Sequence, residues 1–282
     1  GTLGWERHAY SEIWLGKWVP VDILWLEIGY IDATHIKFGE HLDNQAENKV
    51  RAVGIDVKKI EWLKDDVDIE IKDYSLREKS MDYALESSVE MARPGDDLII
   101  VLDLTPQEYM VARVDLEPCK GRDNITSIID EKRKVVILRK GERKVVYWKV
   151  HVNENLPKDY LFTCPLTLNS RSLALRAINI SVRSDSVREG IIKNVRLSSN
   201  SVVEGDKIDV IVDASKLKGK IGVVSEHTHE VRPVISKRMM FEVDAGSVGK
   251  KRLVVYSSEG EVRELEYEVR KTAEGISSVK VK

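Results

Sequence analysis

Residues 94–104, PGDDLIIVLDL, carry the pattern that decides the fold, and residues 204–214, EGDKIDVIVDA, repeat it 110 positions later. In both stretches a Gly-Asp pair precedes a run in which alternate positions are apolar. Alternation with a period of two is typical of a strand with one face on a core. We therefore expect a Gly-Asp turn that starts the same strand of two similar domains. A chance match is the alternative, because Gly-Asp before an apolar strand is common in all-β proteins. The residues expected to be buried are Leu98, Ile100, Leu102, Ile208, Val210 and Val212.

The rest of the 282-residue chain is also rich in short runs of β-branched and aromatic residues, such as KVVYWKVHV (144–152) and KRLVVYSS (251–258). These runs predict a mainly β fold with two tandem β-sandwich, immunoglobulin-like domains at residues 50–185 and 186–282. Both boundaries rest on polar, strand-poor composition.

Two segments permit alternatives. Met81, Leu85 and Val89 have helical spacing, yet strands fit the same residues. Residues 131–144, EKRKVVILRKGERK, are expected to form a solvated hairpin, with anion binding as the less favoured alternative.

Composition excludes several classes of partner. Lys and Arg number 45 against 47 Asp and Glu, so the net charge is only -2 and no nucleic-acid partner is expected. No apolar run approaches the roughly 18 residues that span a bilayer, so direct membrane insertion is not expected either. The 33% of charged residues and the scarcity of glutamine are typical of thermophile surfaces, whereas the asparagine content is not.

The N-terminal stretch RHAYSEIWLGKWVPVD (7–22) predicts a hairpin with chemistry on one face. If Trp14 lies opposite Trp18 across a three-residue loop, opposite positions sum to 32, and Asp22 lies diagonal to His8 on the same face. A two-residue loop would send Asp22 to the other face. The three-residue loop also gathers an apolar face, so we expect it. That apolar face consists of Ile13, Leu15, Val19 and Val21.

These residues, with YIDATHIKF (30–38) after them, resemble the C-terminal half of the core of the transglutaminase-like superfamily, particularly its archaeal members. The resemblance covers about residues 4 to 40. It implies that residues 1–49 are the C-terminal part of such a core. His8 would be the general base and Asp22 its orienting carboxylate in a papain-like Cys-His-Asp triad, which needs no cofactor and acts on a protein or peptide.

The sequence departs from this pattern in two places. Asp22-Ile23-Leu24 replaces the usual Asp-Pro-Thr, and no cysteine precedes His8. We therefore expect the chain to be a fragment, inactive by itself, whose partner is the missing N-terminal part of the core.

Histidines elsewhere give only weak metal patterns, because a site needs three or four convergent ligands. His35 with Asp32 or His41 has no recognised ligand spacing, and His227 and His229 would share one strand face without a third ligand. We expect no metal.

Cys119 and Cys164 are the only cysteines and stand 45 residues apart. A disulfide within the first sandwich is expected, with two buried free thiols as the alternative. Asn124-Ile-Thr and Asn179-Ile-Ser are glycosylation sequons. Together these features favour an extracellular or cell-surface location.

Two classes of function follow. One is the C-terminal part of an extracellular transglutaminase-like or cysteine-protease-like protein that performs thiol acyl transfer on amides. The other is a non-catalytic cell-surface adhesion or scaffold protein that keeps a relic hairpin.

Overall fold

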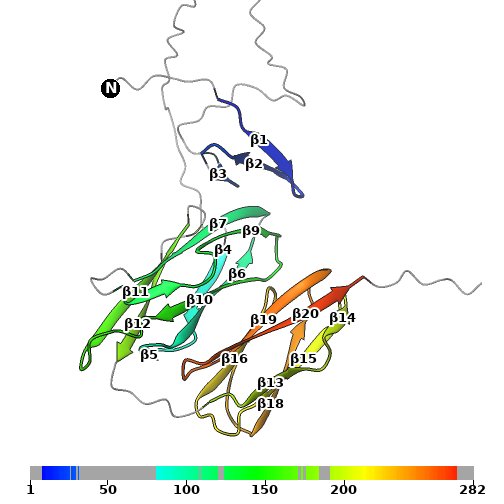
Figure 1. Cartoon of the computed structure of the whole chain (residues 1–282). Helices are drawn as coiled ribbons and strands as arrows, with labels where there is room; N and C mark the ends of the chain where they lie inside the picture. Colours follow the sequence, from blue (N-terminus) through cyan, green and yellow to red (C-terminus); the bar gives the residue numbers. More distant parts are fainter. Residues whose placement is uncertain are drawn as a thin grey trace, which may run out of the picture. The chain divides into compact units, whose positions relative to one another are not determined.

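The computed structural model describes residues 8–25, 27–29, 31, 81–107, 109–119, 124–170, 173, 176–183 and 191–271 (Figure 1). The chain divides into two compact units, residues 1–78 and 79–282, which are considered separately. Every regular element in the described ranges is a strand, so the predicted mainly β, sandwich-like class is confirmed. None of these residues forms a helix with the length and apolar character that crossing a membrane requires. The predicted boundaries at 49/50 and 185/186 lie outside the described residues and stay predictions.

The described part of the first unit is a small antiparallel sheet of order β1-β2-β3. Its strands are β1 (Ser11–Trp14), β2 (Trp18–Asp22) and β3 (Glu27–Ile28).

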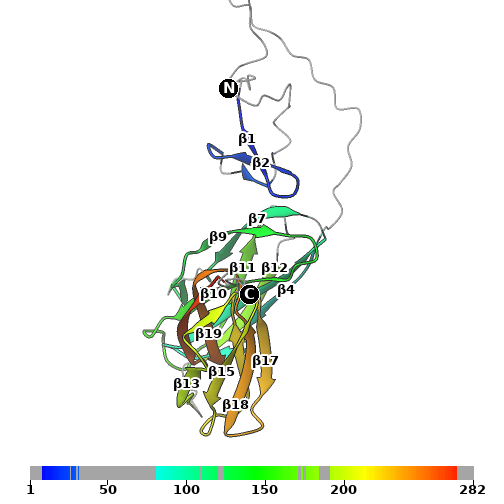
Figure 2. The same ribbon diagram turned by 90° about the vertical axis from the view of Figure 1, so that its right-hand side faces the viewer.

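In the second unit, the strands up to residue 183 form two sheets, of order β4-β6-β10-β8 and β5-β12-β11-β7-β9 (Figure 2). One core, centred on the fully buried Trp148, lies between them. The strands are β4 (Met81–Ser87), β5 (Met91–Ala92), β6 (Asp97–Pro106), β7 (Met110–Glu117), β8 (Thr126–Ile128), β9 (Arg133–Leu138), β10 (Lys144–Val152), β11 (Leu161–Asn169) and β12 (Arg176–Arg183).

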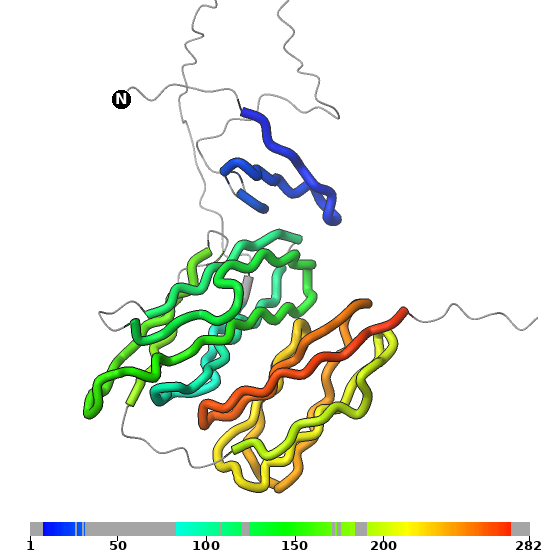
Figure 3. The backbone as a smooth tube through the Cα atoms, in the orientation of Figure 1, coloured from blue at the N-terminus to red at the C-terminus, as the bar shows by residue number. Residues whose placement is uncertain are grey.

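The strands from residue 194 onward form two further sheets, of order β13-β15-β18 and β14-β20-β19-β16-β17 (Figure 3). A second core, which contains the fully buried Phe241, lies between them. The strands are β13 (Asn194–Leu197), β14 (Ser201–Val203), β15 (Lys207–Asp213), β16 (Lys220–Val224), β17 (His229–Pro233), β18 (Arg238–Asp244), β19 (Gly249–Ser257) and β20 (Val262–Arg270).

The two sandwiches share one topology. Strands β4, β6 and β10 correspond to β13, β15 and β18, and the two five-stranded sheets correspond strand for strand, including one parallel pair in each. Strand β8 is the only addition among the described strands. The repeat strands β6 and β15 therefore occupy equivalent places, as the 110-residue repeat predicts.

The Gly-Asp turns before these strands also agree with the prediction. Gly95 and Gly205 have φ values of 81° and 87°, a conformation that glycine adopts at little cost. The backbone N–H of Asp96 donates to the carbonyl of Arg93, and that of Asp206 donates to Val203, at 3.1 and 3.0 Å. All six repeat residues expected in the cores are fully buried.

Strand β6 is buried on its second face as well, because the two sandwiches pack together. Ile99 and Val101 join a separate apolar cluster whose other buried members come from β10, β16 and β19. We call this set the interface cluster: Ile99, Val101, Val145, Val224, Val254 and Tyr256. A continuous apolar run in a strand is typical of burial on both faces.

Ion pairs border the interface cluster. Glu226 accepts hydrogen bonds from Lys144 and Lys251, and Arg93 donates to Glu259 at 3.1 Å. Burial alone would raise the pKa of Glu226, but the two lysines lower it to about 2. The carboxylate therefore stays ionised at neutral pH and holds Lys144 of one sandwich beside Lys251 of the other.

The structure decides between the two alternatives for one segment and contradicts the prediction for another. The stretch with helical spacing forms strands β4 and β5. Residues 131–144 do not form a hairpin, because β9 pairs with β7 while β10 pairs with β6 and β8 in the other sheet. The chain crosses between sheets there, a long-range choice that local charge patterning does not specify.

Gly222 of β16 lies under an aromatic ring at the interface. It pairs across the sheet with Tyr256, and a Cβ added at Gly222 would overlap the Tyr256 ring. Since Tyr256 is buried and hydrogen-bonded to His229, the ring has little room to move. We expect Gly222→Ala to lower the free energy of unfolding by about 1 to 3 kcal/mol, measured by urea denaturation. In a Tyr256→Ala background the overlap is absent, so the same substitution should then cost almost nothing; an equal cost in both backgrounds would refute the explanation.

Candidate functional site

The hairpin of the first unit has the predicted register. Trp14 lies opposite Trp18 and Ser11 opposite Val21, so opposite positions sum to 32. The loop is the expected three residues, with a hydrogen bond from the Leu15 N–H to the Lys17 carbonyl at 2.9 Å. This register carries Asp22 to the same face as His8.

His8 and Asp22 are in contact. The His8 Nε2 atom hydrogen-bonds to Asp22 Oδ2, as the register predicts. The Asp22 side chain is 2% exposed and that of His8 is 24% exposed. The imidazole is thus accessible while its carboxylate partner is screened from water.

Local backbone groups hold Asp22 in place. Its Oδ1 atom accepts hydrogen bonds from the N–H groups of Leu24 and Trp25, at 3.0 and 3.2 Å. Burial alone would raise the pKa of Asp22, but these bonds and the one with His8 hold it below its usual value. Aspartate side chains often accept hydrogen bonds from backbone N–H groups two or three residues ahead. These bonds fix the orientation of the Asp22 carboxylate, although the Asp-Pro-Thr sequence usual in the family is absent.

The pairing decides the chemistry available to the imidazole. A carboxylate only accepts, so the neutral ring carries its proton on Nε2 and its lone pair on Nδ1. Nδ1 is therefore the atom that can take a proton from a nucleophile.

Aromatic rings pack at both ends of the hairpin. The Trp25 ring meets the His8 ring edge-to-face, with centroids 6.3 Å apart, and Trp14 and Trp18 pack edge-to-face at 5.4 Å. The predicted apolar face is only partly buried: Val19 is inaccessible, but Ile13 is 49% exposed.

Glu27 is a residue that sequence reasoning missed. It lies opposite Asp22 in the β2–β3 pairing and is equally buried. No spacing rule marked it, because the short connection between β2 and β3 replaces the expected Asp-Pro-Thr turn. Its position places a second buried carboxyl group opposite Asp22.

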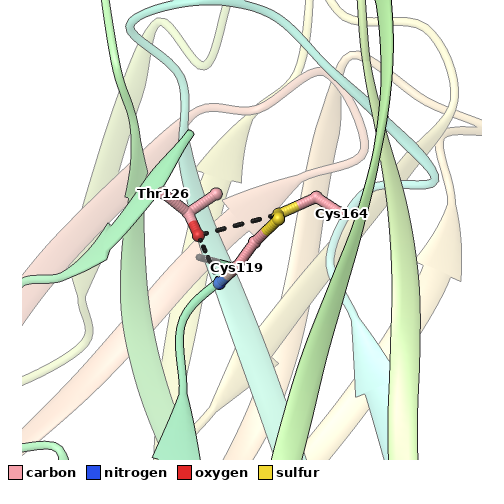
Figure 4. Close-up of a disulfide and its surroundings, with 3 residues drawn as sticks. All are labelled: Cys119, Thr126 and Cys164. Atoms are coloured by element: carbon pink, nitrogen blue, oxygen red, sulfur yellow. Dashed lines mark hydrogen bonds between the residues drawn. A yellow bond between two sulfur atoms is a disulfide. The ribbon is translucent and has the colours of Figure 1, made fainter. Parts of the chain in front are cut away.

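The two cysteines are joined in a disulfide (Figure 4). Their Cα atoms are 5.3 Å apart. Thr126 lies against the bridge, where its hydroxyl accepts from the Cys119 N–H at 3.1 Å and contacts Cys164 Sγ at 3.7 Å. These are the only cysteines in the 282 residues, so none is left as a nucleophile for His8.

The remaining histidines do not converge. His229 starts β17 and contacts Tyr256 Oη at 2.7 Å, whereas His227 precedes the strand, so the two do not share one strand face as expected. Burial lowers the pKa of His229. Asp32, His35 and His41 lie outside the described residues. Within the described ranges, no three His, Cys, Asp or Glu residues are grouped to hold a metal.

Comparison with known proteins gives only distant likenesses. No protein-family model and no curated protein matches the chain. Red sea bream transglutaminase matches 70% of this chain at 12% identity and a TM-score of 0.28. The Yersinia pseudotuberculosis adhesin InvE matches 68% of this chain and 60% of its own, at 9% identity and a TM-score of 0.25. Domains 4–9 of the surface layer protein SbsC match 68% of this chain and 31% of their own, at 13% identity and a TM-score of 0.28.

This chain spans about a third of the transglutaminase chain, 32% of its length. The low TM-scores mean that none of these likenesses carries an argument about function.

Proposed function

We propose that His8 and Asp22 are the base and the orienting carboxylate of a transglutaminase-like Cys-His-Asp site, whose cysteine comes from outside these 282 residues. The observation that carries the proposal is the hydrogen bond from His8 Nε2 to a buried, backbone-anchored Asp22. A histidine that is merely solvated on a strand would not need a hydrogen bond to a buried carboxylate.

The proposed chemistry is thiol acyl transfer on an amide. His8 Nδ1 takes the thiol proton, and the thiolate attacks the amide carbonyl of a protein or peptide. Collapse of the tetrahedral adduct breaks the C–N bond, and His8 returns the proton to the leaving nitrogen. An amine or water then attacks the thioester and loses its proton to His8; the C–S bond breaks, and the released thiolate takes the proton back from His8. Asp22 stabilises the imidazolium in both steps.

An extracellular or cell-surface location is part of the proposal. Disulfides persist in oxidising compartments, and the Cys119–Cys164 bridge supports such a location. The two sandwiches and the proposed site would then both be exposed to the extracellular medium.

The test uses the complete open reading frame that encodes these residues. Incorporation of a fluorescent amine into a glutamine-containing protein, and ammonia release in the absence of amine, are measured for the wild type and for His8→Ala. We expect His8→Ala to reduce kcat/KM by about 10³-fold or more, and Asp22→Asn to act in the same direction.

Another His-Asp pair, in the first sandwich, offers a matched control. His151 Nδ1 lies 2.9 Å from Asp97 Oδ1, so His151→Ala removes a similar pair at a place without the hairpin. Its activity should equal that of the wild type. Equal rates in His8→Ala and His151→Ala would contradict the proposal.

A second candidate is a non-catalytic adhesion or scaffold protein at the cell surface. The observation that favours it is that both cysteines of the chain are bonded to each other. A complete protein with no cysteine-dependent turnover on glutamine or peptide substrates would support this candidate against the first.

A further inference from the structure

Among the described strands, β9 is the last strand of its sheet and has a neighbour on one side only. It pairs with β7 on one side, in a register where opposite positions sum to 248, as in Met110 with Leu138. The N–H of Leu116 donates to the carbonyl of Lys132, so Lys132 faces β7. In an antiparallel pair, facing alternates along the strand. The backbone groups of Arg133, Val135 and Ile137 therefore point away from β7, toward the free edge.

The other long edge strands of the second unit are covered by side chains. On β4, Arg176 donates to the carbonyl of Tyr83 at 3.2 Å. On β17, Arg143 donates to the carbonyl of His229 at 3.1 Å, and Pro233 offers no N–H. Such covering is how proteins prevent edge-to-edge pairing.

Strand β18 is covered at three points. Its carbonyls at Met240 and Arg238 accept from Arg232 and Ser236, at 3.0 and 2.5 Å. Its N–H at Asp244 donates to Thr228 at 3.3 Å. The remaining edge strands β5, β8, β13 and β14 have only two to four residues each.

Strand β9 has six residues, and no side chain of the described residues bonds the outward backbone groups of Arg133, Val135 or Ile137. Two of these three residues have exposed apolar side chains: Val135 is 49% and Ile137 52% exposed. A groove of about 570 Å³ lies beside the strand, with Lys134–Val136 on one side and Lys250, Arg252 and Tyr267 on the other.

The sequence of β9 complements itself. We propose that β9 is the pairing edge of a symmetric homodimer, in which a second copy of this chain adds its own β9 antiparallel, with Val135 opposite Val135. In this register opposite positions sum to 270, so all three outward residues pair with outward residues. Glu131, just before the strand, then meets Arg139, just after it, twice in the dimer. The 3.7 Å pair that Arg139 makes with Glu142 is exposed and weak, so it can be exchanged.

Neighbouring registers are disfavoured by charge. A shift to a sum of 268 places Lys134 opposite Lys134, and a shift to 272 places Arg133 opposite Arg139. Like charges directly opposite each other destabilise a strand pair. A register in which opposite residue numbers give an odd sum would place residues whose backbone groups point outward opposite residues whose groups point toward β7. The hydrogen bonds between the two copies would then be lost.

Sedimentation equilibrium of the 282-residue chain tests the dimer. We expect a reversible dimer whose dissociation constant rises at least tenfold in Glu131→Lys, because two attractive pairs become repulsive. Arg139→Glu should act alike, and the double variant Glu131→Lys/Arg139→Glu should restore the wild-type value. Val135→Pro, which removes an outward N–H, should abolish the dimer.

Glu242→Lys is the matched control, since it changes the net charge equally on the covered strand β18. It should leave the dissociation constant unchanged. A chain that stays monomeric at about 1 mM, or a dimer that the charge variants leave unchanged, would overturn the proposal. If Val135→Pro does not fold, as judged by circular dichroism, the charge-swap pair decides alone.

Discussion

Replacing Cys119 and Cys164 together by alanine is expected to lower the free energy of unfolding of the first sandwich by about 3 to 4 kcal/mol. The bridge spans 45 residues, and closing a loop of that size removes this much conformational freedom from the unfolded chain in the chain-entropy model. Both cysteines are buried in the core, so their removal also leaves unfilled space.

Urea denaturation of the double variant and of the oxidised and reduced wild type measures the effect. The reduced wild type and the double variant should unfold at similar, lower urea concentrations. Thr126→Val is a suitable control, because it removes the hydroxyl beside the bridge and keeps the disulfide; it should cost only about 1 to 3 kcal/mol. A double variant within 1 kcal/mol of the oxidised protein would contradict the expectation.

The hairpin register could be predicted because one choice of loop satisfied two independent patterns. A three-residue loop put four apolar residues on one face and His8 beside Asp22 on the other. The structure has that register. The burial of the apolar face was predicted less well, since alternation identifies a face but does not say how completely it is covered.

The pairing of distant strands could not be predicted from local patterns. The charge-rich composition of residues 131–144 predicted a solvated hairpin, yet β9 and β10 belong to opposite sheets. Which sheet a strand joins depends on the whole core. Likewise, the alternation in β6 predicted burial of one face only, and burial of Ile99 and Val101 on the second face against β16 and β19 was missed, because nothing local identifies those partners.

The candidate site was predictable as far as the hairpin extends. His8 and Asp22 follow from strand geometry and motif, whereas the buried Glu27 depends on the connection between β2 and β3, where the expected turn residues are replaced. Neither strand geometry nor the motif identifies a nucleophile, because the two cysteines are bonded to each other in the disulfide.

Trp148→Ala is expected to separate the unfolding of the second unit into two steps. Trp148 is fully buried at the centre of the first core, and its Nε1 donates to the Lys132 carbonyl at 3.0 Å. Its truncation should cost about 3 to 5 kcal/mol. The second sandwich has its own core, so it should lose only the support of the interface cluster and remain folded after the first has opened.

Phe241→Ala is the matched variant in the other core, where the side chain is equally buried. Hydrogen exchange, measured by mass spectrometry at increasing urea concentration, shows which sandwich opens first in each variant. Peptides from residues 97–152 should lose protection first in Trp148→Ala, and peptides from residues 207–255 first in Phe241→Ala, because each substitution acts on the core that contains it. The interface cluster and the Glu226 ion pairs couple the sandwiches, so each variant should also weaken its neighbour slightly. Simultaneous loss of protection in both halves of both variants would show that the unit unfolds as one, and the predicted division into two domains would then be wrong.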